Sequence, residues 1–474
     1  MKRPFTLLGS CALWCAYLAN PSLADCMAPE TGDPHAWLPS TPFPSYAEPL
    51  PHNQPDCPFY VAAWQTFLYV TRPDADGNPA FLRYPQIRTV LAPWATGGRA
   101  SEASAVLDLE PRKMEMANDP ENLVAAVGPE IAAGIEQAQL GGVLIDQAGN
   151  PIYYAIHFNY HFADFLERHD LLTKDAILRA NESLSFDEPG IVEMKSAWKI
   201  LTNADDRSAY IWKEATVPKL VVSDGKVAVD PGGGTRTVDV ALLALHVAFT
   251  MEGHPEFVWS TFEHVDKAGN PDSAPSATAN PGDTDPEFIA DANASYPLYR
   301  AGTPAKEANL DGMIAANALA ATFDEPTQTF TRNAGAAESV FRAYPASKQS
   351  TTERDEDVDA LNDSVRKRFA DQAAPDPRQN YKLVGAVWLD RPGETFMVGK
   401  AFANAAGQSS DEGPVAGEDG MSSTAMESFT QKAFPSCFSC HDTRAVRTST
   451  FDKIIDAKAL NVSHVLSRFL SGGE

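Results

Sequence analysis

Two cysteines and a histidine stand close together near the end of the chain, as Cys437-Phe438-Ser439-Cys440-His441. Three chemistries use such a C-x-x-C-H pattern: a redox dithiol, half of a zinc site, or the attachment of a haem. A c-type haem needs two thiols to bond its vinyl groups and an imidazole to bind its iron. With two residues between the cysteines, both thiols reach one porphyrin edge and the histidine lies under the iron.

The surrounding sequence separates these three chemistries. A zinc site needs a second pair of ligands with similar spacing, and Cys26 and Cys57 do not form one. A thioredoxin-like dithiol belongs in a βαβ context, whereas a Gly-rich loop and a predicted short helix precede Cys437. The pattern therefore favours one covalent haem c, with Cys437 and Cys440 as thioether links and His441 as the proximal iron ligand.

Residues 1–24 have the features of a cleaved secretory signal. Lys2 and Arg3 precede an apolar run, and Ser22 and Ala24 fit the −3 and −1 positions of a cleavage site. A lipoprotein site at Cys11 is the alternative. We expect delivery to the periplasm, where haem is covalently attached. No later segment has 18 unbroken apolar residues, so we expect no membrane span in the mature protein.

Charge and cysteine usage agree with that compartment. The formal net charge is −25, and the signal carries two basic residues and no acid, so the mature chain is more acidic still. Such a surface repels nucleic acid and anionic lipid and suits a basic redox partner protein. In an oxidising compartment we expect Cys26 and Cys57 to form a disulfide that ties down a Pro-rich leader, residues 25–58.

The motif and its surroundings resemble the large bacterial periplasmic single-haem c-type cytochromes that carry C-x-x-C-H near the C-terminus. The resemblance is specific at residues 437–441 and looser over SSTAMESFTQKAFPSCFSCH, which leads into the motif. The stretch VWSTFEHVD, residues 258–266, is also similar to that group. The resemblance implies a covalent haem and a redox function.

The second axial position of the iron is left open by the sequence. The small electron-carrying cytochromes place an axial Met well downstream of the motif, but no Met follows His441 here. The candidates are Met426 and Met421 just before the motif, Met397 further upstream, and His464 downstream. An axial Met raises the redox potential, a second His lowers it, and an open position permits peroxide or dioxygen chemistry.

A second group of candidates lies in apolar segments far upstream. Glu193 and Lys195 lie in one segment, His246 in another, and Glu263 and His264 in a third. On a strand Glu263 would share a face with Trp259 and Thr261, with His264 on the opposite side. Buried charges need partners, so a Lys195–Glu263 or Lys195–Glu193 pair near His246 is the functional hypothesis, as a substrate pocket or proton relay. Strands with one solvent-exposed face are the structural alternative.

With 474 residues and 44% apolar residues, the chain can bury a core in one to three domains. We expect an α+β fold, with a mixed β-sheet upstream and a mostly helical C-terminal haem-attachment region. The sequence shows no internal repeat. The expected divisions are the signal 1–24, the leader 25–58, an α+β portion 59–265, a loop or linker 266–308, and a C-terminal haem c portion 309–474.

The periodicity predicts individual elements within this frame. Helices are expected at 59–71, 121–140, 162–172, 353–371 and 424–433, and an amphipathic end at 460–469. Strands are expected at 238–249 and 257–265, and a strand or extended segment at 81–91. Hairpins are expected around 146–151 and 391–393, and either a helix or a strand at 191–201.

Three functions fit these features. The first is a periplasmic electron-transfer cytochrome with one covalent haem. The second is a haem-dependent oxidoreductase of peroxidase or oxygenase type, with its pocket in the upstream portion. The third is a binding module in which the haem is structural or sensory. The motif favours redox chemistry, and electron transfer is the function we expect.

Overall fold

The computed structural model describes residues 26, 56–86, 107–108, 144–223, 226–277, 289–309, 322–331, 339–344, 354–372, 374–390, 396–402, 415–417, 421, 423–431, 436–447, 454–463 and 465–466. The expected signal at 1–24 and the expected helix at 121–140 lie outside these residues. Within them, no helix combines the length and apolarity needed to cross a bilayer.

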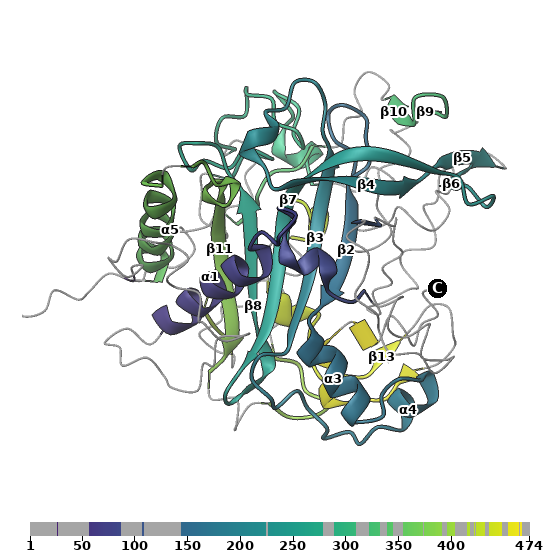
Figure 1. The fold of residues 1–474 in the computed structure, drawn as a ribbon, viewed down its shortest axis with the longest axis vertical. Helices are drawn as coiled ribbons and strands as arrows, with labels where there is room; N and C mark the ends of the chain where they lie inside the picture. The colour runs from purple at the N-terminus through teal and green to yellow at the C-terminus, as the bar shows by residue number, and fades with distance from the viewer. Residues whose placement is uncertain are drawn as a thin grey trace, which may run out of the picture.

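One large β-sheet organises the described residues (Figure 1). Strands β2, β3, β7, β8, β11 and β12 follow one another across it, β4 pairs with the first part of β7, and β1 pairs in parallel with β4. The other pairings are antiparallel. The strands are β1 Leu107–Asp108, β2 Tyr153–Phe158, β3 Val192–Ile200, β4 Trp212–Pro218, β7 Thr235–Met251, β8 His254–His264, β11 Tyr381–Leu389 and β12 Val415–Gly417.

Helices cover one face of this sheet, which we call the helix-covered face. Helix α1 (Cys57–Thr71) crosses in front of the central strands in Figure 1, and α5 (Arg354–Ala370) lies beside it. The ring of Phe67 stacks on that of Phe262 at 4.2 Å, and Trp64 Nε1 donates to Asn362 Oδ1 at 3.0 Å. Apolar packing between helices and sheet therefore builds this side of the core.

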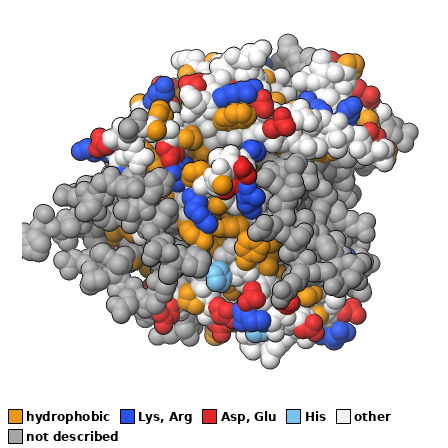
Figure 2. Space-filling model, in the orientation of Figure 1, with side chains coloured by type: hydrophobic (Ala, Val, Ile, Leu, Met, Phe, Trp, Pro, Cys, Tyr) orange, Lys and Arg blue, Asp and Glu red, His pale blue; other side chains and the backbone are white. Residues whose placement is uncertain are grey.

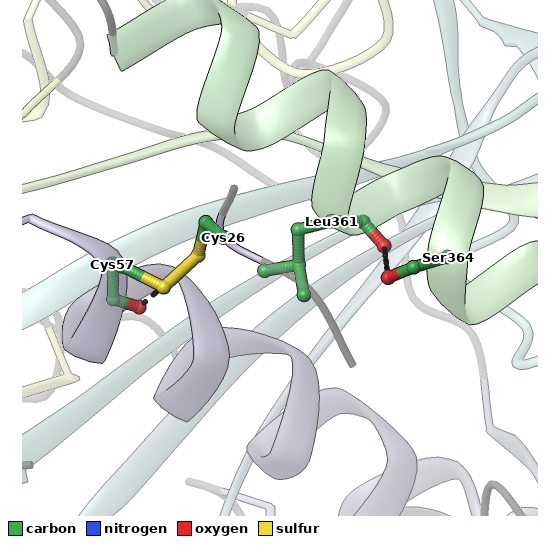
Figure 3. Close-up of a disulfide and its surroundings, with 4 residues drawn as sticks. All are labelled: Cys26, Cys57, Leu361 and Ser364. Atoms are coloured by element: carbon green, nitrogen blue, oxygen red, sulfur yellow. Dashed lines mark hydrogen bonds between the residues drawn. A yellow bond between two sulfur atoms is a disulfide. The ribbon is translucent and has the colours of Figure 1, made fainter. Parts of the chain in front are cut away.

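A disulfide joins Cys26 to Cys57, the first residue of α1, as the cysteine usage led us to expect. Both half-cystines are buried in the apolar cluster of the helix-covered face, together with Leu361 of α5 (Figure 3). The bond therefore fastens the start of α1 at the contact between the two helices.

The last described segments of the chain, 421, 423–431, 436–447, 454–463 and 465–466, pack on the opposite face, which we call the C-terminal face. Phe438, Leu460 and Val462 share a buried cluster there with Phe158 and Trp259 of the sheet. Short elements make up these segments: η9 Cys437–Ser439, β13 Val446–Arg447, β14 Ile454–Ile455 and η10 Ala459–Val462. Helices α3 (Tyr160–Arg168) and α4 (Lys174–Arg179) lie at the same end of the molecule as β13 (Figure 1).

The expectation of a mostly helical C-terminal region is wrong. Residues 424–431 form successive turns instead of the predicted helix at 424–433. Their polar groups are engaged elsewhere, because Thr424 N donates to Glu263, Ser423 N donates to Glu427, and Ser428 Oγ bonds the Thr424 carbonyl. Such side-chain bonds compete with the backbone bonds of a helix.

The sheet also extends beyond the expected linker at 266–308. Strand β11 pairs with β8, so residues from the expected α+β portion and from the expected C-terminal portion share one sheet. The described parts of 266–308 are turns, isolated bridges and the 3-10 helix η6, Ala305–Glu307.

Most long periodic segments have the predicted form. The helices at 59–71 and 353–371 and the strands at 238–249 and 257–265 are confirmed, with shifted ends, and 191–201 is a strand. The strand or extended segment expected at 81–91 begins late where described, because Ala80–Arg83 is the 3-10 helix η2, Tyr84 is extended and Gln86 forms an isolated bridge with His157. The second hairpin is also wrong, because 396–402 is not a strand and bonds to Thr443 instead.

One turn sequence occurs three times, a repeat that the sequence analysis missed. Asp74, Asp146 and Asp266 each begin a D-x-x-G-N-P stretch and accept from the backbone N–H groups two and four residues on. The glycine of each has a positive φ. Asp and Gly supply what such a tight turn requires. The remaining short elements are β5 Leu220–Ser223, β6 Lys226–Val229, β9 Thr322–Asp324, β10 Thr329–Thr331, η5 Arg207–Ala209 and η7 Pro377–Asn380.

Candidate functional site

The C-x-x-C-H motif forms a single tight turn on the C-terminal face. The amides of Cys440 and His441 both donate to the Cys437 carbonyl, at 3.2 and 2.9 Å. Phe438 is fully buried and contacts Phe402 edge to face. The buried phenyl ring anchors the turn, while Cys437, Cys440 and His441 remain half-buried.

Contacts with Val462 and Trp259 orient His441. Its Nδ1 lies 2.9 Å from the Val462 carbonyl oxygen, which can only accept, so Nδ1 carries the proton. The ring of Trp259 on β8 lies 3.8 Å from the imidazole, centroid to centroid. In this tautomer Nε2 is the basic nitrogen, the atom that binds a metal.

Cys437 and Cys440 carry thiols rather than a disulfide. Burial raises the pKa of the Cys437 thiol well above its ordinary value, and the charges of Glu427 and Cys440 raise it further. Reactive dithiols have lowered pKa values, because their surroundings stabilise the thiolate. The surroundings of Cys437 destabilise its thiolate instead.

The four candidates for a second axial ligand have different environments. Met421 is buried in the apolar cluster that contains Phe438 and against which Cys437 packs. Met426 is buried in a separate cluster with Tyr154. Met397 is 50% exposed, although its carbonyl accepts from Thr443 Oγ1 at 2.6 Å. His464 lies outside the described residues.

A polar row crosses the same face next to the motif. Lys195, His246 and Thr261 are direct neighbours on β3, β7 and β8. His246 Nδ1 lies 2.9 Å from Thr261 Oγ1, and its Nε2 lies 2.9 Å from Glu427 Oε1. The structure therefore brings two sequence-predicted candidates, Lys195 and His246, to one place.

Glu427, which lies on the C-terminal segment, contacts this row through His246. Burial by itself would raise the pKa of its carboxyl, but the charge and hydrogen bond of His246 and the charge of Lys195 hold that pKa below its ordinary value. Its second oxygen accepts from Ser423 N at 2.7 Å. Glu427 is thus an ionised carboxylate between the sheet and the motif. It binds His246, and its charge raises the pKa of Cys437.

Glu263 lies on this face too, and its ionic partner is Arg342, not the expected Lys195. Both side chains are nearly inaccessible, with 5% and 1% exposure. The other oxygen of Glu263 accepts from Thr424 N at 2.9 Å. Glu263 of strand β8 therefore binds Arg342 through a buried ion pair, and it binds the run that leads into the motif through the backbone N–H of Thr424.

Sequence reasoning missed Arg342 and Glu427. Each is a lone charge in an otherwise uncharged stretch, VFRAY for Arg342 and MSSTAMESFTQ for Glu427. That isolation is a usable signal, because a single charge among residues that become buried needs a partner.

His264 points to the other side of the sheet, as the alternation on β8 predicts. Its Nδ1 lies 2.7 Å from Asp272 Oδ2, and its Nε2 donates to the Ala209 carbonyl at 2.9 Å. Its ring stacks on Tyr210 at 3.9 Å. These contacts place His264 apart from the polar row.

Glu193 precedes Lys195 on β3 with one residue between them, and its side chain faces the C-terminal segment as well. It is 8% exposed and accepts a hydrogen bond from Ser463 Oγ. Burial raises the pKa of Glu193 to about 7, partly offset by the Ser463 bond.

No protein-family model matches this chain, and comparison with curated proteins and with solved structures finds no match. Among the described residues, no group of three or more His, Cys, Asp and Glu side chains is arranged to hold a metal ion together.

Proposed function

We propose that this protein is a periplasmic c-type cytochrome with one covalent haem, and that it transfers electrons. The observation that carries the proposal is the setting of His441. The Val462 carbonyl fixes the Nδ1–H tautomer and Trp259 fixes the ring, so that Nε2 is the basic nitrogen, while both thiols stand on the same turn. Haem-binding histidines commonly donate their other nitrogen in this way.

The residues present fit the group. Cys437 and Cys440 would hold the haem through thioether bonds, and His441 would bind its iron. The haem supplies one-electron chemistry when bound. The apolar cluster around Phe438, Met421 and Trp259 offers the low-polarity wall that a porphyrin needs.

Two observations disfavour the other uses of the motif. The raised pKa of Cys437 is unfavourable for a redox dithiol, which reacts through its thiolate. The zinc alternative requires further ligands beside the motif, and the described residues offer no such cluster.

The overall charge of −25 supports a basic redox partner. On the face that Figure 2 shows, acidic and basic side chains are interspersed. The net charge, rather than one acidic patch on this face, would therefore steer the encounter, and association should weaken as salt concentration rises.

A haem-dependent oxidoreductase is the second candidate, and one observation favours it. Lys195, His246 and Glu427 form a linked set of ionisable groups beside Cys437. Such a set could bind a substrate or move a proton. If so, Lys195 and His246 are the residues that would take part, with Glu427 holding His246 in place.

Covalent haem is tested by staining denatured protein for haem after expression with a cytochrome maturation system. Wild-type protein should stain, and Cys437→Ala combined with Cys440→Ala should remove the stain. Cys26→Ser with Cys57→Ser is the matched control, because it removes the other cysteine pair and should keep the haem. Zinc in equimolar amount without haem would overturn the proposal.

Absorption spectra in both oxidation states separate the two candidates. An electron carrier should be low-spin in both states and inert to carbon monoxide and peroxide. A high-spin oxidised form that reacts rapidly with peroxide would favour the oxidoreductase, and Lys195→Ala or His246→Ala should then slow that reaction.

A further inference from the structure

The Val462 carbonyl that orients His441 belongs to a short strap, which we define as residues 458–463. Several bonds hold this strap in place. Lys458 Nζ donates to the Ala180 carbonyl at 2.7 Å, and Asn461 Nδ2 donates to the Arg444 carbonyl at 2.9 Å. At its end, Ser463 Oγ donates to the carboxylate of Glu193 in the sheet.

The bond between Ser463 and Glu193 lies next to the carbonyl that orients His441. Ser463 directly follows Val462, so Glu193 binds the residue next to the one whose carbonyl accepts the hydrogen bond from His441 Nδ1. Across the strands Glu193 is the neighbour of Ala248, which is the neighbour of Trp259. Glu193 and Trp259 therefore lie in one cross-strand row of the sheet. Trp259 contacts His441 directly, and Glu193 binds the residue that follows Val462.

We propose that Glu193 is a positioning residue for His441, which acts through Ser463 on the Val462 carbonyl and so sets the redox potential of the bound haem. The inference rests on the proposed haem function. An ionised Glu193 accepts from Ser463 and keeps the Val462 carbonyl in place. A firmer bond from His441 Nδ1 makes its Nε2 more basic, which stabilises the oxidised state and lowers the potential.

The protonation behaviour of Glu193 supports this role and supplies a readout. Burial raises its pKa to about 7, and the Ser463 bond opposes that rise. The ionisable groups around it on this face are Lys195 on its own strand, His246 on β7, and Glu427 and His441 on the C-terminal segment. The potential of the wild-type protein should therefore fall as pH rises through about 7.

The test is a redox titration of haem-loaded variants at pH 5 to 8. Glu193→Ala should raise the ratio of reduced to oxidised protein about tenfold at a fixed applied potential at pH 8, which is about 59 mV for one electron. Glu193→Gln keeps an acceptor for Ser463, so it should restore most of the wild-type potential but lose the pH dependence near 7.

Ser463→Ala is the second variant, because it breaks the same link from the other side. It should reproduce the shift of Glu193→Ala, and the double variant should shift no further. Ser196→Ala is the matched control: Ser196 is buried on the same strand, faces the helix-covered side, and bonds Ala155 O and Trp198 Nε1. It should leave the potential unchanged.

The outcomes are distinct. If Glu193→Ala and Ser463→Ala hold haem but keep the wild-type potential and pH profile, the inference is overturned. If Glu193→Ala does not fold, Ser463→Ala decides. If the wild-type protein carries no haem, the proposed function fails by itself. The His441 Nδ1 proton is then followed by NMR, and an exchange rate unchanged in Ser463→Ala would overturn the positioning role as well.

Discussion

Apolar clusters pack both faces of the central sheet, but the two faces differ in the other contacts that hold them. On the helix-covered face, α1 and α5 pack through apolar and aromatic side chains, such as Phe67 on Phe262, and a disulfide fastens the start of α1. On the C-terminal face, carboxylates join turns to strands: Glu263 holds Thr424, Glu427 binds His246, and Glu193 holds Ser463.

The two kinds of contact constrain a segment differently. Apolar packing is non-directional and gives stability without fixing the orientation of individual groups. Hydrogen bonds to buried carboxylates cost desolvation but have defined directions. A segment that must present two thiols and an imidazole in fixed positions benefits from the second kind of contact, so we expect the C-terminal face to be sensitive to charge and pH and the helix-covered face to be sensitive to volume.

The largest effect is expected at the buried Glu263–Arg342 pair. Arg342→Met leaves the Glu263 carboxylate buried without its ionic partner, so the free energy of unfolding in urea should fall by roughly 3–5 kcal/mol. Arg342→Met combined with Glu263→Gln is the control and should recover much of the loss. A loss under 1 kcal/mol in the single variant would show that charge does not hold this face.

On the helix-covered face, the disulfide gives the comparable test. Cys26 and Cys57 are separated by 31 residues, and in the loop-closure model removing such a crosslink costs about 3–4 kcal/mol. Cys26→Ser with Cys57→Ser should lower the free energy of unfolding, measured in urea, by that amount, and reductant should have the same effect on wild-type protein. If reductant also destabilises the double variant, the effect does not arise from this bond.

The pH dependence of stability should come from Glu193 near neutrality. Its pKa of about 7 is above the ordinary value of 4.5, so the folded state binds the proton more tightly. This stabilisation is complete below pH 4.5 and is lost as pH rises through 7, a change of about 3 kcal/mol. Urea unfolding of Glu193→Gln should lack this loss between pH 5 and 8.

Glu427 should act with the opposite sign and in a different range. Its pKa is lowered, so its contribution to stability is present above the pKa of the unfolded state and is lost as pH falls through the lower folded value.

A wild-type and a Glu193→Gln protein that lose stability in parallel above pH 5 would contradict the assignment of the neutral-pH dependence to Glu193.

The smallest effect is expected at Asn362, a polar residue within the helix-covered face. Its Oδ1 accepts from Trp64 Nε1 and Leu383 N, and its Nδ2 donates to Leu383 O. Asn362→Ala leaves these buried groups unsatisfied and should cost about 1–3 kcal/mol in urea unfolding. Ser364→Ala, which loses the bond to the Leu361 carbonyl in the same helix, should cost less. Neither should change the redox potential.

The helix-covered face was largely predictable from the sequence. The apolar spacing of 59–71 and 353–371 gave the two helices, and the runs at 238–249 and 257–265 gave the central strands. These signals are local, because the period of apolar residues depends on the element itself. Alternation also predicted that His264 would point away from Glu263.

The C-terminal face was not predictable in the same way. Apolar spacing at 460–469 suggested an amphipathic helix, but Ala459–Val462 is a 3-10 turn whose neighbour Ser463 bonds Glu193, 270 residues earlier. Glu427 meets His246 over a separation of 181 residues, and Thr424 meets Glu263 over 161. Local periodicity carries no information about which distant segment supplies a partner.

By itself, the sequence determined the chemistry that the end of the chain could perform: two thiols and an imidazole with the spacing for haem, in an acidic chain with the features of an exported protein. The tertiary structure decided how those groups are held. It placed Trp259 and the Val462 carbonyl on His441, and it gave each buried carboxylate its partner. The physical reason is that residue type fixes what a group can donate or accept, whereas only the folded sheet brings distant donors and acceptors within bonding distance.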